Sequence, residues 1–90
     1  MNIEFDEAKR LKTLKERGLD FLDCSKLFAG DYLEYEDDRF DYGEMRYITF
    51  GSLNDRAVLI IWTPRGDNRR IISMRHMHDE EFEARRRTLD

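Results

Sequence analysis

The first third of the chain carries apolar residues at the three- and four-residue spacing of helices. Between residues 7 and 17 this stripe is formed by Ala8, Leu11 and Leu14. Asp6 precedes the stripe, where a carboxylate can accept the free N–H groups of a first turn. Gly18 follows it, where a left-handed residue can end the helix. Residues 7–17 are therefore predicted to form a helix.

Two further elements are predicted on either side of this helix. Ile3–Phe5 has the composition of a short strand. Asp20 repeats the capping pattern for a second helix that ends at Gly30, and its apolar stripe consists of Phe21, Cys24, Leu27 and Phe28. The two helices are expected to form a hairpin about one short loop.

From residue 32 onward the apolar spacing changes to two, which is typical of strands. Four strands are predicted, at Tyr32–Glu36, Glu44–Leu53, Arg56–Thr63 and Arg69–His76. Asn54-Asp55 is expected to form a two-residue hairpin turn and Pro64–Asn68 the next turn, so these strands should be antiparallel neighbours. The uninterrupted apolar run Val58–Trp62 indicates a central strand that is covered on both faces.

A last helix is predicted to begin near Asp79 and to run to Leu89, with glutamates early and arginines late, as the helix dipole favours. The fold class is therefore expected to be α+β. A helical hairpin near the N-terminus packs on a twisted antiparallel sheet, and a helix follows at the C-terminal end. Ninety residues can bury one modest core, so we expect one domain over residues 1–90.

Length and composition also narrow the cellular setting. The longest apolar run, Ala57–Trp62, is much shorter than the roughly 20 residues of a membrane-spanning helix. The first residues lack the basic-then-apolar order of a signal peptide, so a cytoplasmic protein without membrane contact is expected. Cys24 is the only cysteine, and its apolar neighbours indicate a buried side chain rather than a nucleophile.

The net charge of −4 is unevenly distributed. Residues 1–45 hold seven Lys and Arg against thirteen Asp and Glu, whereas residues 46–90 hold nine Arg against seven Asp and Glu. The acidic excess lies mainly between Asp31 and Glu44. An acidic segment and an Arg-rich half on one small chain fit a molecule that meets both a basic protein and an anionic polymer, although ordinary solvated surface explains them equally well.

The predicted strand Arg69–His76 is the most informative segment. Strict alternation would place Arg70, Ile72, Met74 and His76 on one face and Ile71, Ser73 and Arg75 on the other. An arginine held near a packed face is pre-organised to contact two phosphate oxygens, so an anion site is plausible here. The alternative is that these arginines are strand-edge charges paired with some of the many acids.

Four segments together resemble the BrnT family of bacterial toxins. They are Phe5–Lys9, Gly18–Phe21, Gly43–Tyr47 and Arg70–Arg75, and they extend over nearly the whole chain. The most specific is the last, Arg-Ile-Ile-Ser-x-Arg. The chain departs from the resemblance where relatives usually show Lys-His-Gly, because Arg17 stands at the histidine position, and where alanine is common, because Met74 stands there.

The resemblance implies a RelE-like fold and the toxin of a type II toxin-antitoxin system. Such a toxin is expected to be a metal-independent endoribonuclease that inhibits translation and needs no cofactor. Its partner would be a BrnA-like antitoxin with a ribbon-helix-helix part. The toxin would then reach operator DNA only indirectly, through that antitoxin.

RNA cleavage without a metal uses the ribose 2′-hydroxyl to attack the adjacent phosphate, so the protein must stabilise extra negative charge and move two protons. The candidate catalytic residues are Arg46, Arg70 and Arg75, and the candidate RNA-binding residues are Lys12 and Arg65.

The groups that move the two protons stay open at this point. His76 and His78 have a suitable intrinsic pKa, and an arrangement of Arg, Lys and Tyr side chains that includes Tyr47 is the alternative. The two histidines lack an evident third ligand, so no metal site is predicted.

A second function also stays open. The chain would then be a catalytically degenerate module that acts only by binding its antitoxin through Asp31–Glu44 and exposed strands. Arg17 in place of the family histidine favours this alternative. A DNA-binding protein is disfavoured, because no basic recognition helix is evident and the net charge is acidic.

Overall fold

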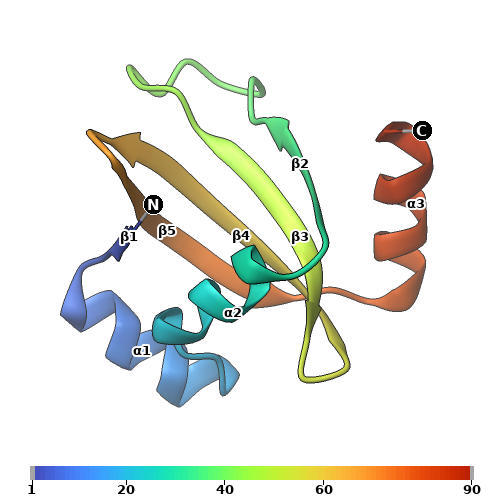
Figure 1. Ribbon diagram of the computed structural model, residues 1–90, viewed down its shortest axis with the longest axis horizontal. Helices are drawn as coiled ribbons and strands as arrows, with labels where there is room; N and C mark the ends of the chain where they lie inside the picture. Colours follow the sequence, from blue (N-terminus) through green and yellow to red (C-terminus); the bar gives the residue numbers. More distant parts are fainter. Residues whose placement is uncertain (1, 90) are drawn as a thin grey trace.

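A computed structural model describes residues 2–89 as a five-stranded sheet with helices on both of its faces (Figure 1). The strand order is β1-β5-β4-β3-β2. Along the chain the elements are β1 (Asn2–Glu4), α1 (Glu7–Arg17), the 3₁₀ turn η1 (Phe21–Asp23), α2 (Cys24–Ala29), β2 (Tyr32–Glu36), β3 (Tyr47–Leu53), β4 (Arg56–Arg65), β5 (Asn68–His76) and α3 (Asp79–Leu89). The expected α+β class is confirmed.

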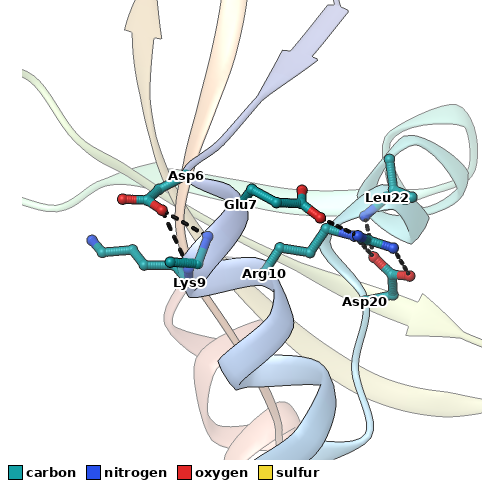
Figure 2. Close-up of polar contacts among 7 residues, drawn as sticks. Asp6, Glu7, Lys9, Arg10, Asp20 and Leu22 are labelled. Atoms are coloured by element: carbon teal, nitrogen blue, oxygen red, sulfur yellow. Dashed lines mark hydrogen bonds and ion pairs between the residues drawn. The ribbon is translucent and has the colours of Figure 1, made fainter.

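Helix α1 begins and ends as its flanking residues predict. The Asp6 carboxylate accepts the backbone N–H of Ala8 at 2.8 Å, and this contact closes the first turn (Figure 2). Gly18 has a φ of 68° and donates its N–H to the Leu14 carbonyl at 3.0 Å. At both ends of the helix, backbone groups at the terminus are therefore hydrogen-bonded.

Polar contacts, rather than buried apolar side chains, fix α1 in place. Leu11 is 54% exposed, and no residue of α1 is buried. Arg10 donates Nε to Asp20 Oδ1 at 2.8 Å, which ties α1 to the next helical segment (Figure 2). Arg17 donates Nη1 to the Met74 carbonyl at 2.8 Å, which ties the other end of α1 to β5.

The second predicted helix is divided into two parts. Asp20 caps it as expected, accepting the Leu22 N–H at 2.9 Å, but the first turn is the 3₁₀ segment η1 and only α2 is α-helical. Cys24, at the start of α2, is 0% exposed, and burial raises the pKa of its thiol to about 12. The prediction that this cysteine is buried is confirmed.

The sheet is mixed, so the expectation of an entirely antiparallel sheet is wrong at one edge. Strand β1 pairs in parallel with β5, with Asn2 opposite Asn68 and Glu4 opposite Arg70. The other neighbours, β5-β4, β4-β3 and β3-β2, are antiparallel. A short first strand can take this place because its distance along the chain from β5 leaves room for a crossover.

Strand β4 is the central strand, as its apolar run predicts. Val58, Ile60 and Trp62 point to one face, where they pack in a core with residues of η1 and α2. Leu59 and Ile61 point to the other face, where they pack with Phe82 of α3 and other apolar residues. Figure 1 shows the same arrangement, with α1 and α2 on one side of the sheet and α3 on the other.

The two predicted turns have different outcomes. Asn54 and Asp55 both have positive φ, 52° and 65°, as a two-residue hairpin turn requires. Pro64, expected in the next turn, lies inside β4 instead, opposite Arg69 of β5. This is tolerated because β3 begins at Tyr47, opposite Trp62, so β4 has no β3 neighbour at the proline.

Candidate functional site

Strand β5 contains a β-bulge that decides where its arginines lie. Ile61 of β4 pairs with Ser73, but the next residue, Trp62, pairs with Ile71, so Ile72 is an extra residue without a partner on β4. An extra residue interrupts the alternation of side chains between the two faces. The side chains before Ile72 are therefore shifted by one face relative to strict alternation.

The bulge brings Arg70 and Arg75 to the same face. They pair with Thr63 and Leu59, which are four residues apart on β4 and so share a face, the one that carries α3. Strict alternation placed these two arginines on opposite faces, and that expectation is wrong. Ile71 and Met74, which alternation also separated, both lie in the core on the α1–α2 side.

Two more of the predicted residues lie close together, where β3 begins and β4 ends. Arg46 directly precedes β3, and Arg65 is the last residue of β4. Each forms an ion pair with Glu44 at 3.3 Å, Arg46 through Nε and Arg65 through Nη2. Arg46 also lies over the Tyr42 ring, 4.0 Å from its centre. Arg65 is two residues from Thr63 on β4, so both side chains lie on the same face. Because Thr63 pairs with Arg70, Arg65 and Arg46 are next to Arg70.

The remaining ion pairs hold Arg70 and Arg75 differently. Arg70 is 3.7 Å from a Glu4 carboxylate oxygen, a loose contact that leaves most of its donors free. Arg75 donates to both oxygens of Glu81 on α3, at 2.9 and 2.6 Å. This contact lowers the pKa of Glu81 and raises that of Arg75. An RNA phosphate would have to displace Glu81 from Arg75.

Sequence reasoning missed Arg39, in the segment between β2 and β3. Its guanidinium donates to both oxygens of Asp37 at 2.8 and 2.9 Å, and Asp37 is only 4% exposed. The positive charge of Arg39 opposes the rise in the Arg75 pKa, so the two guanidinium groups lie near each other. The signal was present in the sequence, because Arg39 is the one cation within the acidic segment.

We call this side of the sheet the arginine face, defined by Arg39, Arg46, Arg65, Arg70 and Arg75. Their ion pairs, with that of Arg85 on α3, join six arginines to four carboxylates, because Glu44 and Glu81 each contact two. The described pairs therefore leave an excess of two positive charges. Within these pairs, guanidinium groups outnumber carboxylates, which favours an anionic ligand over a cationic one.

Lys12 lies apart from the other predicted residues. It lines a cavity of about 200 Å³ between α1 and β5, together with Lys9, Thr13, Glu16, Arg17, Ile72 and Ser73. Three cations and one carboxylate line this cavity. Ser73 pairs with Ile61 and therefore points to the arginine face, so the cavity is next to that face, across the β5 edge.

Two of the candidate proton-transfer groups, Tyr47 and His76, lie on the side opposite the arginine face, whereas His78 lies beside Glu81, the partner of Arg75. Tyr47 stacks on Trp62 on the α1–α2 side, with ring centres 4.9 Å apart. His76 pairs with Val58 and faces the same side, and the His78 carbonyl accepts the Phe82 N–H of α3. Tyr42 does lie beside the arginines, with its hydroxyl 3.2 Å from Asp37 Oδ2.

Much of the family resemblance rests on residues with a structural role. Phe5 and Phe21 pack edge to face, with ring centres 5.9 Å apart, in the core. Asp6 and Asp20 cap their helices, and the Arg10 contact lowers the pKa of Asp20. These residues therefore account for the fold, and the predicted catalytic arginines, Arg46, Arg70 and Arg75, are not among them.

A comparison with protein-family models decides the family. The model described as "Ribonuclease toxin, BrnT, of type II toxin-antitoxin system" matches residues 5–81 of the 90. The chain belongs to the BrnT family. This match covers every residue of the arginine face, and it implies a ribonuclease toxin with an antitoxin partner. No curated protein matches the chain.

Neither a helix that could span a membrane nor a metal-binding cluster of side chains is present within residues 2–89. None of the helices within residues 2–89 is long and apolar enough to cross a membrane. In the same part of the chain, His, Cys, Asp and Glu side chains do not gather in a group of three that could hold a metal ion. The chemistry that the arginine face offers is charge stabilisation by guanidinium groups.

Proposed function

We propose that this BrnT-family protein is a metal-independent endoribonuclease that inhibits translation in the cytoplasm. Its arginine face binds the RNA backbone, with Arg46, Arg70 and Arg75 at the scissile phosphate and Arg65 and Lys12 on flanking phosphates. A BrnA-like antitoxin with a ribbon-helix-helix part neutralises it and connects it to operator DNA. The helices and sheet are arranged as in RelE-like toxins, and residues 1–90 act as one domain.

The proposed chemistry follows from what arginines can do. Attack by the 2′-hydroxyl gives a phosphorane-like transition state with more negative charge than the substrate. Guanidinium groups that are already in place stabilise that charge without reorganisation. Sheet packing provides this placement, because Arg70 pairs with Glu4 of β1 and Thr63 of β4, and Arg75 pairs with Leu59 of β4. Tyr42 is a phenol beside Arg46 and Asp37, and its hydroxyl can donate a hydrogen bond.

The observation that carries the proposal is the bulge at Ile72. Without the extra residue, Arg70 and Arg75 would lie on opposite faces and could not contact one phosphodiester. A bulge interrupts the ladder hydrogen bonds, and bulges are frequent next to active sites, where they re-aim a side chain. Its place between the two arginines supports a shared role for them.

Growth arrest in cells tests the proposal. Arg70→Ala and Arg75→Ala are expected to relieve the arrest that the wild-type protein causes, at equal protein levels and with unchanged circular dichroism spectra. Arg56→Ala is the matched control, because Arg56 is exposed at the far end of β4 and should remain toxic. Full toxicity of both folded test variants would refute the proposal.

A second candidate function is favoured by the ion pairs of the arginine face. Arg75 is held at two points by Glu81, and Arg17, in the family histidine's place, donates to a backbone carbonyl. In this alternative the chain is a degenerate toxin that only binds its antitoxin. Purified protein that binds the antitoxin but leaves RNA intact in EDTA would establish it.

A further inference from the structure

One partly buried arginine of β5 has no anion beside it. The guanidinium carbon of Arg69 is 3.9 Å from the centre of the Phe28 ring and 5.1 Å from that of Trp62. Its Nε is buried and makes no hydrogen bond, and no carboxylate of residues 2–89 pairs with Arg69. Arg17, Arg56 and Arg87 also lack such a pair within these residues, but Arg17 donates to the Met74 carbonyl and the other two are exposed to water.

A cavity opens directly at this guanidinium. Its volume is about 240 Å³, and it is lined by Ile3, Ser25, Phe28, Ala29 and Arg69. The aromatic rings fix the plane of the guanidinium, so its free N–H donors have lost their freedom before any ligand arrives. The site is therefore pre-organised for a planar, two-oxygen anion.

We propose that this cavity binds one carboxylate of the antitoxin, from an Asp or Glu that is flanked by an apolar side chain. Arg69 takes the two carboxylate oxygens, and the apolar neighbour packs on Ile3, Phe28 and Ala29. This inference rests on the antitoxin of the proposed function and is independent of RNA cleavage. It places an anchor on the α1–α2 side of the strand whose other side carries Arg70 and Arg75.

Two features favour a protein carboxylate over an RNA phosphate here. Arg69 is the only cation among the five residues that line the cavity, whereas an RNA strand carries a charge at every nucleotide and needs several cations. Three of the other four described lining residues are apolar, which offers contacts to an aliphatic or aromatic neighbour of the carboxylate. The cations that suit RNA are on the arginine face.

Nuclear magnetic resonance tests the site with simple probes. The Nε–Hε resonance of Arg69 is followed while a blocked tripeptide, one glutamate between two leucines, is added at millimolar concentrations. We expect a saturable shift that the glutamine counterpart reproduces at least threefold more weakly. An equal response to both peptides, or a shift caused only by a single-stranded oligouridylate, would overturn the proposal.

Affinity for the antitoxin encoded beside the toxin gene tests the partner. Arg69→Gln removes the guanidinium. Ala29→Leu keeps the guanidinium but fills the cavity. Each variant is expected to bind the antitoxin at least tenfold more weakly. Arg56→Gln is the matched control and should bind as the wild type does. Unchanged affinity in a folded Ala29→Leu variant, whatever Arg69→Gln does, would overturn the inference. RNA cleavage is not measured, so failure of the nuclease proposal leaves this result interpretable.

Discussion

Replacing Glu81 with glutamine tests directly whether Arg75 meets RNA. In the folded protein both oxygens of Glu81 accept hydrogen bonds from Arg75, at 2.9 and 2.6 Å. Glutamine keeps the size of the side chain but removes its charge. If the arginine face binds RNA, Glu81→Gln should strengthen binding because a phosphate no longer competes with a carboxylate for Arg75. Arg75→Ala should weaken it.

The salt dependence of binding gives the magnitude. Each phosphate neutralised on a single strand adds about 0.7 to the slope of log affinity against log salt. If Arg75 neutralises one more phosphate in the Glu81→Gln variant, the slope should steepen by up to about 0.7. Between about 50 and about 200 mM salt, that is an extra change in affinity of about 2.6-fold. Because both variants concern the same phosphate, the steepening in Glu81→Gln and the flattening in Arg75→Ala should together amount to about 0.7. The loss of the Glu81 ion pair itself should cost at most about 1 kcal/mol of folding stability, because the pair is partly exposed.

Fluorescence anisotropy with an RNA that carries 2′-O-methyl groups measures binding without cleavage. Glu83→Gln is the matched control, because Glu83 is on the same helix and pairs with Arg86 instead. It should leave the slope unchanged. Identical slopes for the wild type, Glu81→Gln and Arg75→Ala would refute the placement of Arg75 at RNA.

Three predictions concern stability. Met74 is fully buried, so Met74→Ala should lower the free energy of unfolding in urea by about 2–5 kcal/mol; no loss would show that the core is not packed as described. Gly18→Ala should cost about 1 kcal/mol in the same assay, because alanine is strained at a φ of 68° although there is space for its methyl group; an unchanged value would contradict the left-handed cap. The Arg39 contact lowers the pKa of Asp37, so its stabilisation is complete above the ordinary aspartate pKa of about 3.9 and is lost as the pH falls through the lowered one. Asp37→Asn should therefore be less stable at neutral pH and should lose less stability in acid, and parallel pH curves for the two proteins would refute this.

Local signals made most of the fold predictable. Asp6 and Gly18 bound α1, and Asn54-Asp55 forms a hairpin turn, because each acts through its own backbone or its nearest neighbours. The parallel pairing of β1 was missed for the opposite reason. Three residues carry no signal of direction, and their partner lies more than sixty residues away along the chain.

The candidate site was only partly predictable, because a shift of one residue in the pairing of β4 with β5 decides on which face each arginine lies. Nothing in Ile71-Ile72-Ser73 distinguishes a bulge from regular alternation, since all of these side chains are tolerated on either face. The arginines were found from their number and spacing, but their common face was not. Arg69 was counted among the arginines of its strand but was not singled out as a site residue, because its aromatic neighbour Phe28 comes from a distant helix.

Cleavage of RNA by the purified protein in EDTA tests the central claim, that a bulge gathers arginines into a metal-independent nuclease site. Under single-turnover conditions the wild type and the Arg56→Ala control are expected to produce fragments at the same rate. Arg70→Ala and Arg75→Ala should each slow the reaction by on the order of a hundredfold, as the loss of one pre-organised donor does in other enzymes. Intact RNA with the wild type, or undiminished rates in both folded variants, would contradict the account.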